Sequence, residues 1–361
     1  MEGNPPRLPV PKGRGASSNP PNRFHPIEVD WDPDWLEEER LRGSAGPRVA
    51  TECFEDHSRS VLSRNDSPDV KFDYSLNPYR GCEHGCIYCY ARPSHEYLGY
   101  SAGLDFESKI MVKRDAPALL AAELESRRWQ PQVIGLSGNT DCYQPAEKHF
   151  RLTRACLEVL LEYRNPVEIV TKGALVLRDL DLLQALASQA LVRVTFSVTS
   201  LDTALSLAME PRAAAPTRRL EVIQRLAESG VPVRVNVAPI IPGLNDHELP
   251  QILKEAAARG ADCANYILLR LPGEVEGLFT EWLGRVYPDR ADKVIHAIQD
   301  VRGGNMNDTR FGVRMRGVGV RAEAISTMFA IHCKKLGLNT GQIEFNIAAF
   351  RRRGAAQQSL F

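Results

Sequence analysis

The sequence has no net charge and no long apolar run, and each absence argues against a class of protein. Its 361 residues include 45 Lys and Arg and 45 Asp and Glu, which argues against a protein that coats nucleic acid through charge alone. No run approaches the roughly 20 apolar residues of a membrane span. The N-terminus, Met-Glu-Gly-Asn-Pro-Pro, lacks the apolar core of a signal peptide. We therefore expect a cytoplasmic protein with reduced cysteines and no membrane partner.

Several common site motifs are also missing. The sequence has no G-x-x-x-x-G-K-[ST] phosphate loop and no G-x-G-x-x-G turn that follows a strand. Its scattered histidines form no metal-ligand spacing, and no second C-x2-C pair completes a zinc knuckle. The composition, 43% hydrophobic and 25% charged, is that of an ordinary globular protein.

Three cysteines lie within eight residues, as Cys82, Cys86 and Cys89 in the spacing C-x3-C-x2-C. Thiolates are the ligands of iron–sulfur clusters, and three of them on a cubane with four irons leave one iron open to chemistry. A structural zinc with His84 or Cys53 as the fourth ligand is one alternative, and three unrelated buried cysteines are another. The tight grouping favours a [4Fe–4S] cluster and a redox enzyme.

The residues around these cysteines resemble a known family. The radical S-adenosylmethionine (radical SAM) superfamily has the signature C-x3-C-x-aromatic-C, in which Tyr88 would be the aromatic residue. The wider run 77–92 is similar to the uncharacterised proteins related to spore photoproduct lyase. This resemblance implies that the open iron chelates S-adenosyl-L-methionine and that reductive cleavage yields a radical that abstracts hydrogen from a substrate. It also implies a flavodoxin- or ferredoxin-like electron donor.

From about residue 70, β-rich runs alternate with amphipathic helical stretches, a pattern that predicts a parallel sheet. The strand candidates are Phe72–Leu76, Val133–Leu136, Val167–Val170, Leu191–Val198, Pro232–Pro239 and Cys263–Leu269. The helix candidates between them are residues 117–127, 152–163, 180–189, 217–229 and 249–259. Six such units match the partial (β/α)6 barrel of the radical SAM fold. The cysteine loop follows the first strand, at the edge where such folds place their chemistry.

The domain prediction has four parts. Residues 1–69 form a largely irregular N-terminal arm, and residues 70–272 form the partial barrel. Residues 273–345 form a C-terminal helical cap, with helices near 278–287, 291–302 and 321–336. Residues 346–361 form a basic, flexible tail.

The loop after the second strand holds four candidate cofactor-binding residues: Gly138, Asn139, Thr140 and Asp141. In radical SAM enzymes this position binds the amino group of the cofactor's methionine part, and Asn, Thr and Asp supply the acceptors that an ammonium needs. The alternative is a plain turn with Asp141 as a helix cap. The resemblance also suggests Tyr88, Tyr90, Lys172, Ser197, Arg212 and Ala238 as cofactor-binding residues. Lys172 would pair with the cofactor's carboxylate or simply face solvent, and Arg212 would bind the cofactor or pair with Glu210.

Spore photoproduct lyase relies on a cysteine as hydrogen donor near this loop, and Gly138 occupies the corresponding place here. Cys142 lies four residues further on and is our candidate catalytic residue, with an inert buried thiol as the alternative. Arg270, at the end of the last strand, lies where substrate is expected. The glycine at position 138, in place of the lyase's cysteine, argues against lesion repair of the same kind.

The last five residues, Gln357 to Phe361, are similar to the peptide with which bacterial repair proteins bind the sliding clamp. Leu360 and Phe361 offer two apolar anchors, and three arginines upstream could contact DNA phosphate. The leading hypothesis is a radical SAM enzyme acting on a DNA lesion or nucleotide. The same chemistry on a peptide or small metabolite is a second hypothesis. A zinc- or cluster-stabilised nucleic-acid-binding protein without catalysis is a third.

Overall fold

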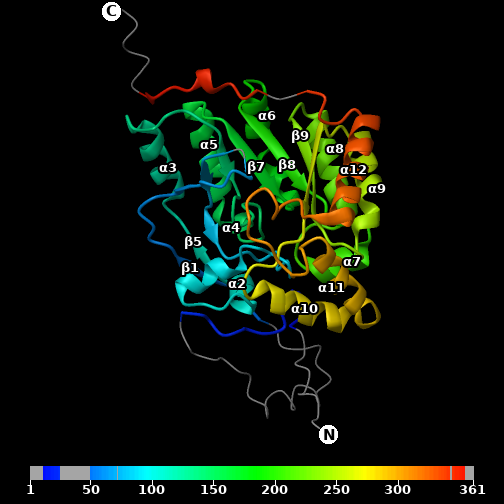
Figure 1. The fold of residues 1–361 in the computed structure, drawn as a ribbon. Helices are drawn as coiled ribbons and strands as arrows, with labels where there is room; N and C mark the ends of the chain where they lie inside the picture. The colour runs from blue at the N-terminus through cyan, green and yellow to red at the C-terminus, as the bar shows by residue number, and fades with distance from the viewer. Residues whose placement is uncertain (1–10, 25–48, 71, 342–343, 354–361) are drawn as a thin grey trace, which may run out of the picture.

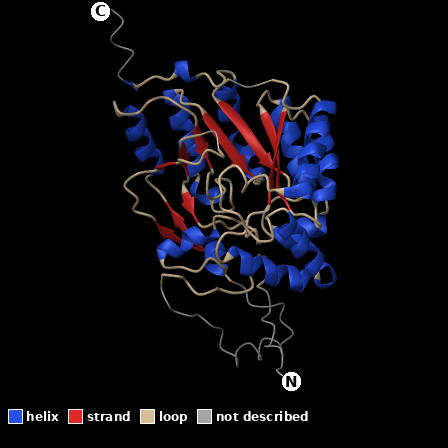
Figure 2. Ribbon diagram, in the orientation of Figure 1, coloured by secondary structure: helices blue, strands red, loops and turns tan. Residues whose placement is uncertain are grey.

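Six parallel strands in chain order form the centre of the computed structural model, which describes residues 11–24, 49–70, 72–341 and 344–353. They are β3 (Tyr74–Leu76), β6 (Ile134–Leu136), β7 (Val167–Thr171), β8 (Val192–Ser197), β9 (Val233–Ile240) and β10 (Cys263–Leu268). The sheet order is β10-β9-β8-β7-β6-β3-β2, with β2 (Leu62–Arg64) antiparallel to β3 at one edge. All six strand predictions are confirmed (Figures 1 and 2).

Helices between the strands cover the sheet. They are α3 (Ala116–Glu125), α5 (Leu152–Tyr163), α6 (Leu180–Ala187), α8 (Pro216–Glu228) and α9 (Leu249–Ala258). Each is amphipathic: α8, for example, buries Leu220, Ile223 and Leu226 at intervals of three residues. All six residues of β8 are buried because protein covers both faces of this strand. The five helix predictions between strands are confirmed.

Three further helices follow the sheet: α10 (Val275–Val286), α11 (Ala291–Asp300) and α12 (Gly319–Lys335). Figure 1 shows α10, α11 and the segment 11–24 near the end of the molecule to which the strand arrows point. An apolar cluster that includes Phe279 and Trp282 of α10 also contains Ala16 of that segment and Ile87 of the cysteine loop. The three C-terminal helix predictions are confirmed, and α10 supports the loop on which the site depends. No described helix is both long and apolar enough to cross a membrane.

The structure also contains a second, smaller sheet of strand order β1-β5-β4, which the sequence analysis did not predict. It comprises β1 (Glu52–Glu55), β5 (Lys109–Val112) and β4 (Tyr79–Arg80). The range 1–69, predicted to be largely irregular, therefore carries two short strands, β1 and β2. The remaining short helices are α2 (Leu104–Ser108), α4 (Glu147–Phe150) and α7 (Thr203–Met209), with 3-10 turns η1 (Arg92–Leu98), η2 (Ala174–Asp179), η3 (Asp246–Glu248), η4 (Pro288–Arg290) and η5 (Ile347–Ala349).

The described part of the predicted tail 346–361 contacts α5. The Arg351 amide donates to the Tyr163 carbonyl at 2.9 Å, and the Arg353 guanidinium pairs with Glu162 at 2.7 Å. Arg352 donates to two main-chain carbonyls at 3.0 and 3.1 Å. The proposed clamp-binding peptide, Gln357–Phe361, lies outside the described residues.

Candidate cluster and cofactor site

The cysteine loop begins directly after β4, and its backbone is fixed at both ends. The Cys82 amide donates to the Phe106 carbonyl at 2.9 Å, and the Ile87 amide donates to the Met209 carbonyl at 3.0 Å. Gly85 has φ +65°, and a Cβ there would lie 2.6 Å from a Glu107 carboxylate oxygen. Only glycine fits this turn without strain or displacement.

Three free thiols meet in this loop. Cys82 and Cys86 are buried and Cys89 is partly buried, and none of the eight cysteines forms a disulfide. Burial raises the pKa of each of the three thiols, and the charges of Cys86 and Cys89 raise that of Cys82 further. Opposing this, Lys172 lowers the pKa of Cys86 and Arg92 lowers that of Cys89, so two cations favour the thiolate forms.

This donor set fits a [4Fe–4S] cluster held at three corners. Among the residues that the structure describes, no group of three or more His, Cys, Asp or Glu side chains is arranged to hold a single metal ion. The zinc site considered as an alternative is therefore not formed there. A cubane takes its thiolate ligands further apart than a single ion does.

A buried ion pair joins the cysteine loop to the N-terminal arm. Glu107 and Arg92 are both fully buried, and their side chains meet at 2.5 Å. Arg92 also donates to the Cys86 carbonyl at 3.0 Å. The same carboxylate accepts from the main-chain amides of Gly15, at 2.9 Å, and Ala16, at 2.8 Å. The arm and the loop therefore share one buried acceptor.

The loop after β6 packs against the cysteine loop through Asp141. Its carboxylate accepts from the Thr171 hydroxyl at 2.7 Å and the Lys172 amide at 2.8 Å, and lies 3.3 Å from the His84 Nδ1. Burial raises the pKa of Asp141, but His84 and these donors outweigh it, and the result is a pKa of about 2. Asp141 thus holds the ends of β6 and β7 together, and its oxygens already have partners within the protein.

The other candidates in this loop also make internal contacts. The amides of Asn139 and Thr140 donate to the Asn77 side-chain oxygen at 2.9 and 3.4 Å. The Tyr90 hydroxyl donates to the Gly138 carbonyl at 2.7 Å. The structure therefore brings Tyr90 and the loop after β6 together, while their binding of a cofactor stays a prediction.

A second buried carboxylate, Glu210, lies beside Tyr88. The Tyr88 hydroxyl donates to Glu210, the Thr199 hydroxyl donates to it at 2.8 Å, and Arg219 pairs with it. The Lys172 ammonium is more distant, at 3.9 Å from Glu210 and 5.6 Å from the centre of the Tyr88 ring. Burial raises the pKa of Glu210 despite the opposing effect of Arg219. The sequence analysis named Glu210 only as a partner for Arg212 and missed this role.

Comparison with known families matches residues 76–256 to the radical SAM superfamily. The chain belongs to the radical SAM superfamily. It is 38% identical over 222 residues to an uncharacterized protein of Mycobacterium tuberculosis, covering 61% of this chain and 65% of that protein. It is 32% identical over 175 residues to an uncharacterized protein of Methanocaldococcus jannaschii, covering 48% of this chain and 63% of that protein. The match thus spans less than two thirds of the length of these relatives.

Among solved structures, a spore photoproduct lyase variant with bound AdoMet and dinucleoside spore photoproduct superposes with a TM-score of 0.58. The superposition covers 87% of this chain and 86% of that chain at 15% identity. The likeness shows that the α/β fold is of the radical SAM type. Membership of the superfamily implies an enzyme that uses an iron–sulfur cluster and S-adenosyl-L-methionine.

Cys142 is not itself part of the cysteine loop of this radical SAM protein, although its chain neighbours Asp141 and Gln144 contact that loop. It is fully buried in the main apolar cluster, where burial raises its pKa, and its amide donates to the Ser137 hydroxyl at 2.7 Å. This packing is what the inert-thiol alternative expects, and the catalytic role of Cys142 stays a prediction. Arg212 also departs from expectation, because it pairs with Glu83 at 3.0 Å rather than with Glu210.

Ser197 and Ala238 lie near the Glu210 group through their main-chain carbonyls. The Ser197 carbonyl accepts from Arg219 at 3.3 Å, and the Ala238 carbonyl accepts from Thr199 at 3.0 Å. The ends of β8 and β9 therefore contribute to the same region as Tyr88.

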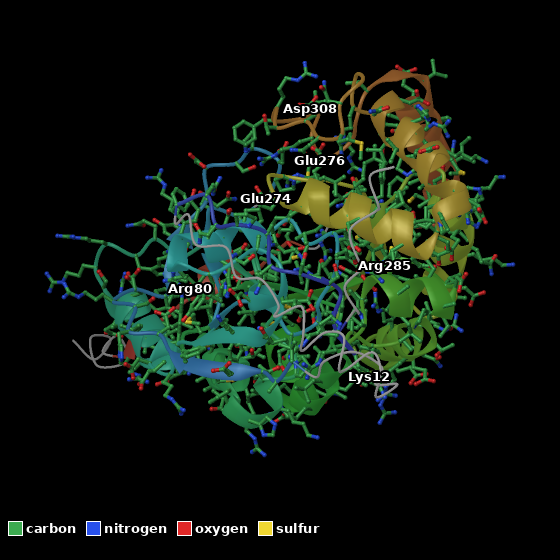
Figure 3. The ribbon with its side chains drawn as sticks, turned by 90° about the horizontal axis from the view of Figure 1, so that it is seen from below. Lys12, Arg80, Glu274, Glu276, Arg285 and Asp308 are labelled. Atoms are coloured by element: carbon green, nitrogen blue, oxygen red, sulfur yellow. The ribbon has the colours of Figure 1, made fainter. Side chains whose placement is uncertain are left out.

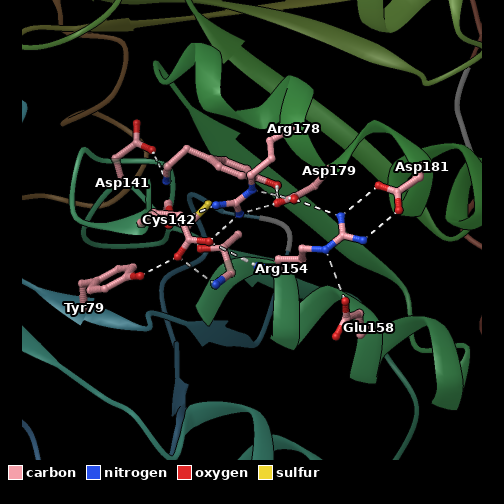
Figure 4. A network of polar contacts seen from close by, with 11 residues as sticks. Tyr79, Asp141, Cys142, Arg154, Glu158, Arg178, Asp179 and Asp181 are labelled. Carbon is pink, nitrogen blue, oxygen red and sulfur yellow. Dashed lines mark hydrogen bonds and ion pairs between the residues drawn. The ribbon is translucent and has the colours of Figure 1, made fainter. Parts of the chain in front are cut away.

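A further polar network connects the strand that leads into the cysteine loop with the helices beside it (Figure 4). The fully buried Glu147 accepts from the Tyr79 hydroxyl at 2.5 Å and from Arg178 at 2.6 Å. Arg178 and Arg154 both pair with Asp179, at 2.8 and 3.2 Å. These contacts tie β4, which leads into the cysteine loop, to α4, α5 and η2. They form a scaffold rather than a second site.

Proposed function

We propose that this chain uses a [4Fe–4S] cluster bound by Cys82, Cys86 and Cys89 to cleave S-adenosyl-L-methionine and abstract a hydrogen atom from a nucleotide or DNA lesion. The observation that carries the proposal is the grouping of three free thiols, two buried and one partly buried, at the edge of the sheet where the parallel strands end. That edge is where α/β folds place their chemistry. When bound, the cluster and cofactor supply the one-electron chemistry.

The residues around the loop would hold and orient these groups. Arg92 and Lys172 supply positive charge beside thiolates that burial alone would disfavour. Glu210 and Thr199 hold the Tyr88 hydroxyl, which fixes the ring next to Cys89. Lys172, whose only ion pair among the described residues is the 3.9 Å contact with Glu210, would bind the cofactor's carboxylate.

The wall of the site would keep water out. Ile87 is fully buried and shares an apolar cluster with Phe279 and Trp282 of α10, and Ala16 of the arm closes the same cluster. A dry site prevents side reactions of a reactive species. The proposed substrate class rests on the solved lyase structures, which hold a dinucleoside photoproduct.

The test is anaerobic reconstitution with iron and sulfide, followed by reduction with dithionite in the presence of S-adenosyl-L-methionine. We expect charge-transfer absorbance, about four irons per chain and release of 5′-deoxyadenosine. The Cys86→Ala variant should lose all three signals. Cys156→Ala is the matched control, because Cys156 is equally buried but lies in α5. A colourless wild-type protein, or a coloured Cys86→Ala protein that still releases 5′-deoxyadenosine, would refute the proposal.

We propose two partners. A flavodoxin- or ferredoxin-like protein would supply the electron, and replacing dithionite by such a protein with its reductase should sustain 5′-deoxyadenosine formation. The terminal residues Gln357–Phe361 would bind a bacterial sliding clamp. Titration of the C-terminal peptide onto a clamp tests this, and binding that survives Leu360→Ala and Phe361→Ala would count against it.

A further inference from the structure

Arg270 is a partly buried cation that forms no direct ion pair within the described residues. It follows β10, its guanidinium carbon lies 5.5 Å from the centre of the Tyr90 ring, and its NH1 lies 4.0 Å from the Met315 sulfur. Its Nε is buried and has no hydrogen-bond partner, and within the described residues it forms no ion pair. The nearby Asp69 carboxylate acts on Arg270 electrostatically but pairs directly with Arg314, and withdrawing a guanidinium from water without an anion of its own is unfavourable. The arrangement is therefore incomplete by itself.

The loop that covers Arg270 adds more positive charge. Arg302, Arg310, Arg314 and Arg316 all lie between α11 and α12. Arg314 pairs with Asp69 and Arg310 with Asp308. Arg302 and Arg316 have only neutral partners in the described part of the chain, mainly main-chain carbonyls. Figure 3 shows the loop that carries Asp308 near the start of α10, where Glu274 precedes the helix and Glu276 lies in its first turn.

The region around Arg270 and the loop between α11 and α12 also exposes aromatic rings. Tyr90, directly after Cys89, is 47% exposed, and Phe311 is 54% exposed. The Arg314 guanidinium stacks 4.3 Å from the centre of the Phe311 ring. Exposed rings beside arginines provide stacking surface for nucleobases, and guanidinium groups bind phosphate through paired N–H donors. A solvent-reachable Tyr90 means that a ligand can approach Arg270.

We propose that Arg270 binds a phosphate group of the substrate, so that the substrate is a nucleotide or polynucleotide whose phosphate lies beside Tyr90. This inference rests on the proposed function, since it assigns the substrate class of the same site. The Arg270–Tyr90 contact places the phosphate one residue from the third cysteine, and the exposed Phe311 offers a surface for a neighbouring base. A role limited to holding the Tyr90 ring is the competing explanation.

The test measures binding of a fluorescein-labelled single-stranded oligodeoxynucleotide to the reconstituted holoenzyme with S-adenosyl-L-methionine, by fluorescence anisotropy at several salt concentrations. Arg270→Met keeps the length of the side chain and removes the charge, and should weaken binding about tenfold and reduce the salt slope by about 1. Arg270→Lys should restore part of the affinity. Arg218→Met is the control, because Arg218 is exposed on α8 and already pairs with Glu221 at 2.8 Å; it should bind like the wild type.

Competition separates the sources of the phosphate. A deoxynucleoside monophosphate that displaces the probe from the wild type, but not measurably from Arg270→Met, identifies a nucleotide site, whereas displacement only by oligonucleotides identifies a polynucleotide site. Unchanged affinity in Arg270→Met, or a wild type that binds no oligonucleotide, would overturn the proposal. Loss of iron absorbance in Arg270→Met along with binding would also overturn it, since Arg270 would then act through Tyr90. Iron content and 5′-deoxyadenosine release of the wild type, measured on the same sample, report on the proposed function separately.

Discussion

Replacing Glu107 by glutamine should both destabilise the protein and release its N-terminal arm. The carboxylate accepts three hydrogen bonds at 2.5 to 2.9 Å, from Arg92, Gly15 and Ala16. Glutamine keeps the volume but removes the charge and one acceptor, which leaves Arg92 buried and uncompensated. Breaking a buried ion pair on one side costs about 3–5 kcal/mol. We take the lower end, about 3 kcal/mol, because Arg92 keeps its three main-chain carbonyl acceptors.

Two measurements check this expectation. Urea unfolding of the anaerobic protein, followed by tryptophan fluorescence, gives the loss of stability. Limited trypsin digestion reports whether the arm is still bound, because cleavage after Arg14 becomes faster once the arm leaves Glu107. Glu281→Gln is the matched control: Glu281 also contacts the arm, through the Ser17 hydroxyl at 3.1 Å, but it is about half exposed. Its change should stay within about 0.5 kcal/mol. A loss under about 1 kcal/mol in Glu107→Gln, with unchanged digestion, would refute the reasoning.

Three other changes test the packing around the site. The Cys142→Ala variant should release 5′-deoxyadenosine like the wild type. Its free energy of unfolding in urea should be lower by about 1 kcal/mol, because the thiol lies in the core; loss of the product would instead support a catalytic role. Gly138→Cys should cost about 1–3 kcal/mol, because a Cβ there would lie 2.8 Å from the Ser75 Cβ; an unchanged unfolding midpoint would contradict this. Burial lowers the pKa of His95 from its ordinary 6.5 to about 4. Below pH 6.5 the unfolded chain takes up a proton that the folded chain does not, so stability should fall by about 3 kcal/mol towards pH 4. His95→Phe should remove that part of the slope, measured by urea unfolding across this range, and an identical pH profile would contradict it.

The main sheet could be predicted because its signal is local. Buried parallel strands are apolar runs of four to eight residues, and the helices between them repeat their apolar positions at helical spacing. The small sheet could not be predicted, because its short strands lie outside the alternation of strands with long amphipathic helices that revealed even the three-residue strands β3 and β6. The strand β1 pairs with β5 in a register that sets Glu52 opposite Lys109. Nothing in either sequence segment specifies a partner so distant along the chain.

The candidate site likewise has one part that could be predicted from the sequence and another that could not. The three cysteines could be found from their spacing, because all of them lie on one short loop. The contacts of Asp141 could not, since its partners His84 and Thr171 lie far from it along the chain in opposite directions. The sequence analysis offered Asp141 as an acceptor for a ligand, whereas the fold uses it to join two strand ends. A polar residue at the end of a strand can serve either purpose, and only the folded neighbours decide which.

Glu210 shows why the charge of the site needs the structure. Within the described residues, this buried carboxylate pairs closely with Arg219 and only distantly with Lys172. One carboxylate thus faces two cations, and one positive charge is left over next to Cys86, where Lys172 favours the thiolate. Lys172 is partly exposed, and an anion beside it would be stabilised; cluster-bound thiolates together with a ligand carboxylate would supply that charge. Arg270, which contacts the Tyr90 ring beside the third cysteine, has no ion pair of its own among the described residues, because the nearby Asp69 pairs with Arg314; the anion that would neutralise Arg270 is the one we assign to the substrate.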